Sequence, residues 1–405
     1  MIDQLLSPHI QLFIEQHQRD DPNDLRLKYK TIFDIPANIV IDQITGRKKA
    51  KEKLPTWSAN KRIIYPPSLN LEQSSSERTA LMKKSIVESV PDISSHTAKL
   101  LDLTGGFGVD SLFLSKVGKE LHFVEPDENL LAIAKHNHRQ LGAANIHYHN
   151  TTAETFFDSI PHSIDFDLVY IDPSRRSESG RKVLSLYECE PDVLKLLPKI
   201  FTLTNRIMLK TSPLLDIKLA LSELRYVQKV YVIAVFNECK ELLFLCGNEN
   251  NAGPAIEALN LADRDHSFSF TFSEEEDAVV TYSDPKKYLF EPNASILKSG
   301  AFKTIAARFE ISKLHPNTHL YTADRVIADF PGRTFKIESS VKSNPKELEN
   351  LFVDSKANIL TRNYPLSVAE LRQKTRLKEG GDKFLIGCSG LKNKFLLVAS
   401  RSDSL

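Results

Sequence analysis

The chain has 405 residues, of which 41% are hydrophobic and 26% charged, and a chain of this length and composition folds into about two to four globular domains. Its formal net charge of +1 excludes a whole-protein electrostatic field that attracts nucleic acid or an anionic membrane, so such partners must be argued from local charge. The four cysteines form no CxxC pair, which argues against a disulfide framework and favours a reducing compartment.

Residues 1–90 are rich in charged residues and helix formers, and their apolar positions recur every three or four residues, as in LLSPHIQLFI and ERTALMKKSIVESV. This spacing predicts an N-terminal helical region. In the opening stretch, MIDQLLSPHIQLFIEQHQRDD, polar residues interrupt the apolar ones, which is typical of neither a signal peptide nor a membrane span. We therefore expect a cytoplasmic protein.

From Lys99 the pattern changes to short apolar runs separated by amphipathic segments. The runs are KLLDL, ELHFVE, IHYH, FDLVYID, RIMLK, VYVIAVF and LLFLCG. Strands that alternate with helices predict a parallel sheet with helices on both faces, over residues 91–248. Only NECKE separates the last two runs, which is too short for a parallel crossover, so we expect an antiparallel hairpin there.

Two smaller regions follow the polar segment NENNAG. Residues 254–329 indicate a second mixed region. Residues 330–405 predict strand, helix, strand, helix, strand and strand, in FKIESSV, PKELENLFVD, NILTRNY, VAELRQKTRLK, FLIGCS and FLLVAS. From Pro331 onward the chain has 14 Lys and Arg against 8 Asp and Glu, a net charge of +6. The last module is therefore expected to be a basic α/β domain.

A glycine-rich turn follows the first strand, in LLDLTGGFGVDS, residues 100–111. Gly105, Gly106 and Gly108 leave backbone N–H groups uncovered, and the helix that follows favours negative charge at its N-terminus. The dinucleotide fingerprint GxGxxG does not fit, because Ser111 stands where the third glycine is required. The turn also lacks the GKS or GKT of a P-loop.

What the turn does match is an acid, three residues and then GxG, which resembles the first motif of the class I S-adenosylmethionine-dependent methyltransferases. The resemblance implies a seven-stranded Rossmann-like sheet, an acid for the ribose hydroxyls at the end of the second strand, and adenine contacts from NTTAE, residues 150–154. The residues that it implies for the cofactor are Asp102, Thr104, Gly105, Gly106, Phe107, Gly108, Asp110, Glu125, Ala153, Glu154 and Asp172.

The acceptor side is expected in IDPSRR, which ends the fourth strand at the sheet's carboxyl edge. Amino-methyltransferases of adenine or guanine carry an acid or Asn, two prolines and an aromatic ring here, and Ser174 and Arg175 depart from that pattern. The arginines are expected to contact phosphates, although a solvated basic loop is the alternative. The catalytic candidates are Asp172, Pro173, Ser174, Arg175 and Arg176.

Two other chemistries are not supported by the sequence. A pyrimidine C5 methyltransferase needs a cysteine nucleophile, and none stands beside Pro173. Four histidines, His136, His138, His147 and His149, cluster in the chain, but no carboxylate or cysteine completes a ligand set at recognisable spacing. We therefore expect no metal.

A wider resemblance covers nearly the whole chain. YLFEPNASILKSGAFKTIAARF, TRNYPLSVAELRQKTRLKEGGDKFLIGCS, DPSRR and NECKELL together resemble the bacterial THUMP-like methyltransferases. This resemblance implies a ferredoxin-like region at 254–329 and a THUMP-like domain at 330–405. Because THUMP domains accompany RNA-modifying enzymes, it also implies a structured RNA as the partner.

The basic residues of the last module independently indicate an RNA partner. Arg372 and Arg376 are expected on one face of a helix, and a basic surface with an aromatic ring can bind an RNA backbone. A merely solvated basic helix is the alternative. The expected substrate-binding residues are Arg362, Tyr364, Arg372, Lys374, Arg376 and, at the acceptor pocket, Lys210.

Together these features predict an α/β S-adenosylmethionine-dependent methyltransferase that acts on a base nitrogen of transfer or ribosomal RNA. Two alternatives stay open: a methyltransferase of a protein or small molecule, and a non-catalytic RNA-binding protein that retains the fold.

Overall fold

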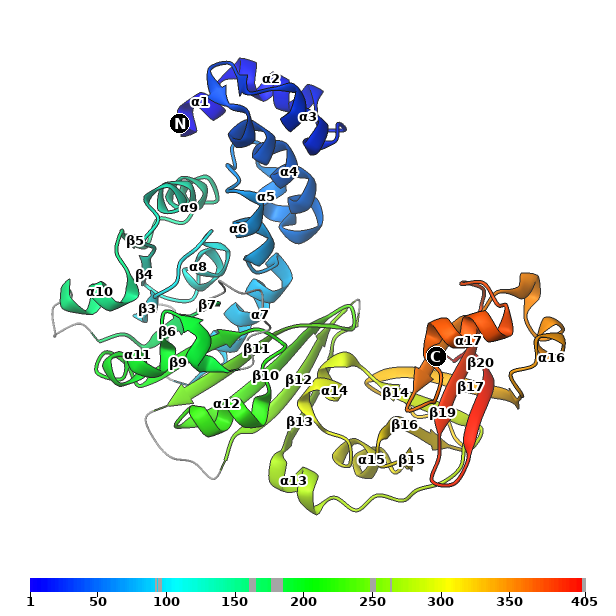
Figure 1. Ribbon diagram of the computed structural model, residues 1–405. Coiled ribbons are helices and arrows are strands. Elements are labelled where there is room, and N and C mark those ends of the chain that lie inside the picture. The colour runs from blue at the N-terminus through cyan, green and yellow to red at the C-terminus, as the bar shows by residue number, and fades with distance from the viewer. Residues whose placement is uncertain are drawn as a thin grey trace. The chain divides into compact units, whose positions relative to one another are not determined.

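The computed structural model describes residues 1–91, 93, 97–159, 165–175, 185–247, 253–262 and 264–402 (Figure 1). The chain divides into two compact units. The first comprises Met1–Gln228 and Leu242–Asn251, and the second Lys229–Glu241 and Ala252–Leu405. Within the described ranges, every helix is too short or too polar to span a membrane.

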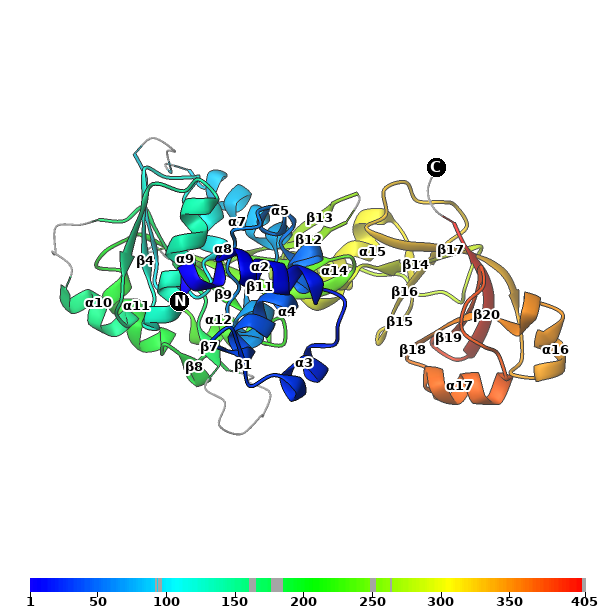
Figure 2. The same cartoon turned by 90° about the horizontal axis from the view of Figure 1, so that it is seen from above.

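The predicted N-terminal helical region is confirmed (Figure 2). Its elements are α1 (Ile2–Leu5), α2 (Pro8–Gln16), α3 (Pro22–Lys28), β1 (Thr31–Ile32), β2 (Ile35–Pro36), α4 (Ala37–Lys53), α5 (Pro55–Ala59), α6 (Ser68–Gln73) and α7 (Glu77–Glu88). The side chain of Ser76 caps α7 by accepting the N–H of Thr79. Trp57 is fully buried, and its ring lies 4.8 Å from that of Phe107 in the glycine turn. The helices therefore share a hydrophobic core with the segment that carries the predicted site.

The first unit is built on parallel strands. They are β3 (Lys99–Asp102), β4 (Glu120–Val124), β5 (Ile146–His149), β6 (Leu168–Ile171) and β9 (Arg206–Thr211), in the spatial order β9-β6-β3-β4-β5. The connecting elements are α8 (Val109–Leu114), α9 (Glu128–Gln140), α10 (Ala153–Ser159), β7 (Ser174–Arg175), η1 (Leu186–Glu188), β8 (Cys189–Glu190), α11 (Val193–Ile200) and, after β9, α12 (Ile217–Glu223). Every residue of β6 is buried, as a parallel sheet covered on both faces requires. The Rossmann-like arrangement is confirmed.

The expected hairpin is formed by β10 (Val227–Val235) and β11 (Glu238–Gly247). Phe236 and Asn237 make its turn with φ of 48° and 65°, the left-handed pair that matches a two-residue turn to the strand twist. Strand β11 therefore begins inside NECKE, which the sequence indicated as the connection. Two further strands, β12 (Ala255–Leu261) and β13 (His266–Thr271), extend the order to β13-β12-β10-β11-β9-β6-β3-β4-β5.

The second unit carries a seven-stranded sheet in the order β15-β16-β14-β17-β20-β19-β18. Its elements are α13 (Phe272–Asp277), β14 (Tyr288–Pro292), α14 (Ala294–Ser299), α15 (Thr304–Phe309), β15 (Ser312–His315), β16 (Thr318–Ala323), β17 (Gly332–Ser340), α16 (Pro345–Glu349), η2 (Val353–Ser355), β18 (Asn358–Arg362), α17 (Val368–Thr375), β19 (Lys383–Ser389) and β20 (Lys394–Arg401). The order predicted for the last module is confirmed. Because β14 pairs with β17, the two C-terminal regions share one sheet.

A buried ion pair joins the N-terminal helices to the parallel sheet. The ammonium of Lys83 on α7 is fully buried and lies 3.2 Å from Oδ1 of Asp110, in the first turn of α8. The hydroxyls of Ser75 and Tyr170 each donate to Oδ2 of Asp110 at 2.7 Å. Burial opposes ionisation of Asp110, but Lys83, Lys210 and these hydrogen bonds outweigh it and lower the pKa of the carboxyl. Ser75 and residues of α7, β6 and β9 therefore all stabilise the charged carboxylate of Asp110.

We expect Lys83→Met to lower the free energy of unfolding by about 3–5 kcal/mol, because it leaves the buried carboxylate of Asp110 without its cation. Lys84→Met is the matched control, since Lys84 pairs with Glu88 at the protein surface and such a pair contributes about 0.5 kcal/mol or less. Urea unfolding followed by circular dichroism measures both. Equal, small losses for the two variants would contradict the role of the buried pair.

Candidate functional site

The glycine turn between β3 and α8 has the backbone conformation that only glycine adopts without strain. Gly106 and Gly108 have φ of 57° and 84°. A Cβ atom on Gly105 would lie 2.3 Å from the ring of Phe123, whereas one on Gly106 would meet nothing closer than 3.8 Å. The turn is therefore packed tightly against the sheet at Gly105 and open at Gly106.

Asp102 supports this turn from inside the protein. Its side chain is buried, and it accepts hydrogen bonds from the backbone N–H of Thr104 at 2.9 Å and from the hydroxyl of Ser111. Burial raises its pKa to about 7, although both hydrogen bonds act in the opposite direction. Asp102 thus connects the end of β3 to α8 and fixes the shape of the loop between them.

Glu125 closes the same site from the end of β4. One carboxylate oxygen accepts from the N–H of Gly106 at 2.8 Å, and the other from the N–H of Asp127 at 2.8 Å. Burial raises the pKa of Glu125. The side-chain amide of Asn150 donates to the carbonyl oxygen of Glu125 at 2.9 Å. Three segments predicted to hold the cofactor therefore meet at the carboxyl edge of the sheet.

The remaining cofactor candidates divide into two groups. The ring of Phe107 packs into the core against Trp57, and Asp110 forms an ion pair with Lys83. Both side chains therefore stabilise the glycine turn from within the protein. Ala153 and Glu154 begin α10, the first buried and the second exposed.

Asp172 lies beside the glycine turn, at the end of β6. Its backbone N–H donates to Oγ1 of Thr104 at 2.6 Å, and the same hydroxyl lies 3.5 Å from Oδ1 of Asp102. The ammonium of Lys210, at the end of β9, lies 2.5 Å from Oδ2 of Asp172. The structure therefore brings the predicted acceptor residues Asp172 and Lys210 into contact.

A small cavity of about 40 Å³ is lined in part by Pro173 and Thr211, the residues that directly follow Asp172 and Lys210 in the chain. The hydroxyl of Thr211 is buried and has no hydrogen-bond partner among the described residues. Ser174 donates its hydroxyl to the carbonyl oxygen of Glu190 at 3.2 Å, within the short β7–β8 pair. The side chain of Arg175 and the whole of Arg176 lie outside the described residues.

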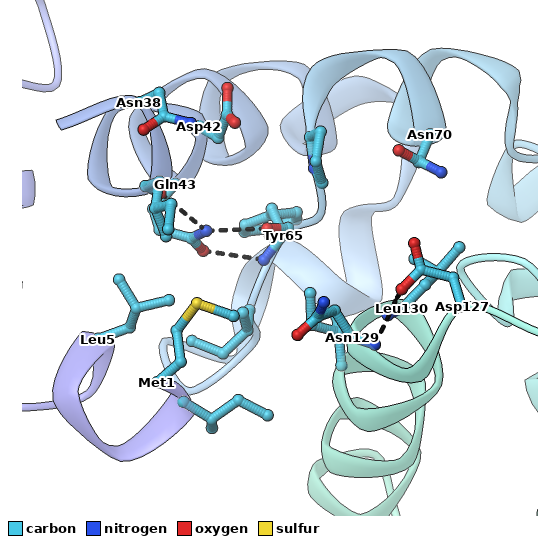
Figure 3. A pocket seen from close by; sticks show the side chains of 15 residues that line it. Met1, Leu5, Asn38, Asp42, Gln43, Tyr65, Asn70, Asp127, Asn129 and Leu130 are labelled. Carbon is cyan, nitrogen blue, oxygen red and sulfur yellow. Dashed lines mark hydrogen bonds between the residues drawn. The ribbon is translucent and has the colours of Figure 1, made fainter. Parts of the chain in front are cut away.

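A larger cavity, of about 250 Å³, was not predicted from the sequence (Figure 3). Helices α1, α4 and the start of α9 enclose it, together with residues 64–70. Gln43 exchanges hydrogen bonds with the backbone of Tyr65 across one wall, both at 2.8 Å, and Asp127 caps α9 at another. Its lining comes from helices distant in the chain, so no local motif indicates it.

The predicted RNA-binding residues of the second unit are only partly available for binding. Arg362 pairs with Glu291 at 2.6 Å, and Arg372 with Glu379 at 3.2 Å. The expectation that Arg372 shares a helical face with Arg376 is wrong, because α17 ends at Thr375 and Arg376 is its left-handed cap with φ of 60°. A residue in that conformation cannot continue the helix.

Other basic residues of this region stay exposed. Lys374 and Arg376 are exposed and form no ion pair within the described part of the chain. Tyr364 packs its ring over Gly387, where a Cβ atom would lie 2.8 Å from it.

Comparison with known proteins agrees with this architecture. Residues 288–331 match the model of a ferredoxin-like domain, and residues 332–401 match a THUMP domain-like model. The strand order and the glycine-turn site, together with these domains, define a class I methyltransferase with a C-terminal THUMP-like domain. The crystal structure of a putative methyltransferase from Porphyromonas gingivalis is 31% identical, with a TM-score of 0.84, over 97% of this chain and 98% of that one. The chain belongs to the family of that protein.

A second relative is matched over a shorter range. An uncharacterized RNA methyltransferase from Treponema denticola is 26% identical over an alignment of 156 residues that covers 33% of this chain. The match covers 37% of the length of that protein.

We expect Gly106→Val to abolish S-adenosylmethionine binding, because its side chain covers the amides of the open turn. Gly142→Val is the matched control, since Gly142 has φ of 83° with open space around it and lies beyond the end of α9. Both variants carry the same kind of backbone strain, so only occlusion of the site separates them. Calorimetric binding that is equal in the two variants would contradict this assignment.

Proposed function

We propose that the chain transfers a methyl group from S-adenosylmethionine to a base nitrogen of structured RNA, such as transfer or ribosomal RNA, in the cytoplasm. The observation that carries the proposal is the convergence of the glycine turn, Glu125 and Asp172, through hydrogen bonds of 2.6–2.9 Å to Thr104 and Gly106. The four cysteines are free, which agrees with a reducing compartment.

The residues at this edge fit the chemical groups of S-adenosylmethionine. The turn is open on the side of Gly106, where a Cβ atom would meet nothing closer than 3.8 Å, and it leads into α8, an arrangement that favours the ligand's carboxylate. Glu125 is buried and presents a carboxylate that can exchange its backbone partners for the ribose hydroxyls. The cofactor supplies an already activated sulfonium methyl group. The protein's task is therefore to align the acceptor and to exclude water.

Asp172 and Lys210 are suited to orient the acceptor. Lys210 binds Oδ2 of Asp172, while Oδ1 has no hydrogen bond among the described residues. That oxygen is able to accept from an exocyclic amine and so to direct the nitrogen lone pair at the methyl group. A neutral amine needs little proton abstraction before it attacks, so positioning supplies much of the rate.

Two independent observations support RNA as the acceptor. The relative from Treponema denticola is named an RNA methyltransferase, and a THUMP-like domain occupies residues 332–401. In that domain Lys374 and Arg376 are exposed and form no ion pair with another described residue. Both can therefore contact phosphates without breaking such a pair.

We expect Asp172→Ala to reduce methyl transfer by about 100-fold or more, with the affinity for S-adenosylmethionine nearly unchanged. Asp165→Ala is the control, because Asp165 is exposed just before β6. Tritiated-methyl transfer to total RNA measures turnover, and calorimetry measures cofactor binding. If cofactor affinity falls as far as turnover, Asp172 belongs to the cofactor pocket.

We expect Lys374→Glu/Arg376→Glu to weaken the binding of structured RNA and to flatten its salt dependence, by up to about 0.7–0.9 in slope for each phosphate that the variant no longer neutralises. The control with the same change of charge is Lys30→Glu/Lys51→Glu, at exposed positions of the N-terminal region. Filter binding at several salt concentrations gives both quantities. Truncation is unsuitable, because removing β17 opens the sheet at β14.

The same assays separate the alternatives. Methyl transfer to a protein extract but not to RNA would favour a protein methyltransferase. RNA binding with no transfer to any acceptor would favour the non-catalytic RNA-binding protein. Mass spectrometry of nucleosides from cells with and without the gene identifies the modified base.

A further inference from the structure

Four metal-ligating side chains lie on one face at the edge of the parallel sheet. Glu120 and His122 alternate along β4, and His147 and His149 alternate along the edge strand β5. The two strands run parallel with His122 opposite His147. Because side chains two residues apart point to the same face of a strand, this register places His147 beside His122, with Glu120 two residues before His122 on β4 and His149 two residues after His147 on β5.

The distances between these groups approach those of a metal site. One ligand atom each of Glu120, His122 and His147 lies within 4.8 Å of the others. Nε2 of His147 is 3.7 Å from Oε2 of Glu120, and Nε2 of His149 is 3.1 Å from Nδ1 of His122. In a tetrahedral zinc site with bonds of about 2.1 Å, neighbouring ligand atoms lie about 3.4 Å apart. Glu120, His122 and His147 can therefore reach that geometry by side-chain rotation, and His149 adjoins the group through His122.

Two of the imidazoles, those of His122 and His149, have lowered pKa values. Burial, together with the neighbouring imidazoles of His149 and His147, lowers the pKa of His122 to about 4. Burial and His147 also lower the pKa of His149. Neutral rings keep the lone pair that a metal requires.

One cation competes for this site. The ammonium of Lys99 on β3 lies 3.4 Å from Oε1 of Glu120. Its side chain is 41% exposed, so it can turn into solvent when a stronger cation binds. The imidazole of His147, with 56% of its side chain exposed, leaves a path from solvent to the cluster.

We propose that Glu120, His122 and His147, with His149 as a fourth ligand, form a binding site for a divalent transition metal ion, for which Zn²⁺ is the best match. Imidazole and carboxylate ligands in tetrahedral arrangement suit Zn²⁺, whereas Mg²⁺ and Ca²⁺ prefer oxygen ligands alone. This site was not predicted from the sequence, because its carboxylate, Glu120, lies on β4 and is distant in the chain from His147 and His149 on β5. The ion would cross-link β4 to the outermost strand.

The test uses tag-free, full-length protein stripped of metal with a chelator and then titrated with Zn²⁺. We expect one equivalent to bind and the melting temperature to rise, because the ion binds only the folded arrangement. His147→Ala and Glu120→Gln should each weaken the affinity about tenfold or more. His9→Ala is the control, since His9 is exposed on α2, outside the cluster. Circular dichroism checks that the variants fold.

Cobalt provides a second readout that does not depend on stability. Stoichiometric Co²⁺ should give the intense visible absorption of a tetrahedral site in the native protein and lose it in His147→Ala. Absence of one-equivalent Zn²⁺ binding, or binding that neither variant weakens, would overturn the proposal. The result does not depend on methyl transfer, so it tests the metal site separately from the proposed function.

Discussion

The ion pair between Lys83 and Asp110 is the interaction on which the first unit depends. A lysine with no exposed surface is stable only beside a carboxylate that stays charged, because an unpaired buried charge costs several kcal/mol. Asp110 begins α8, directly after the glycine turn, and Ser75 and Tyr170 hold its second oxygen. The N-terminal helices are therefore part of the methyltransferase core, and the position of the glycine turn depends on them.

The predictable part of the structure follows from local chemistry. Apolar runs of four to seven residues predicted the parallel strands. An acid that stands at the end of such a run can be assigned to the end of that strand from the sequence alone. Asp102, Glu125 and Asp172 were identified in this way, and the structure connects all three to the glycine turn through Thr104 and the backbone of Gly106. Parallel strands bring their carboxyl ends to one edge, so strand order alone places these residues together.

The parts that could not be predicted depend on packing between distant segments. Nothing near Asp110 in the sequence shows that Lys83 neutralises its carboxylate. Asp110 was therefore predicted to bind the cofactor. Arg376 follows a helical pattern, yet the helix ends one residue earlier in a left-handed cap. Arg362 and Glu291 are paired by a sheet that joins two regions expected to be separate. The cavity lined by Tyr65 likewise arises only from packing.

The imidazole of His138 links the outermost strand to the glycine turn. It is fully buried, with Nε2 2.8 Å from the carbonyl oxygen of Gly108 and Nδ1 3.0 Å from the hydroxyl of Tyr148 on β5. Because a carbonyl can only accept, Nε2 must carry the hydrogen, and burial lowers the pKa of the ring to about 4, so Nδ1 accepts from Tyr148. A single tautomer thus fixes the spacing between Tyr148 on β5 and the backbone of Gly108, so the shape of the glycine turn depends on the position of the outermost strand.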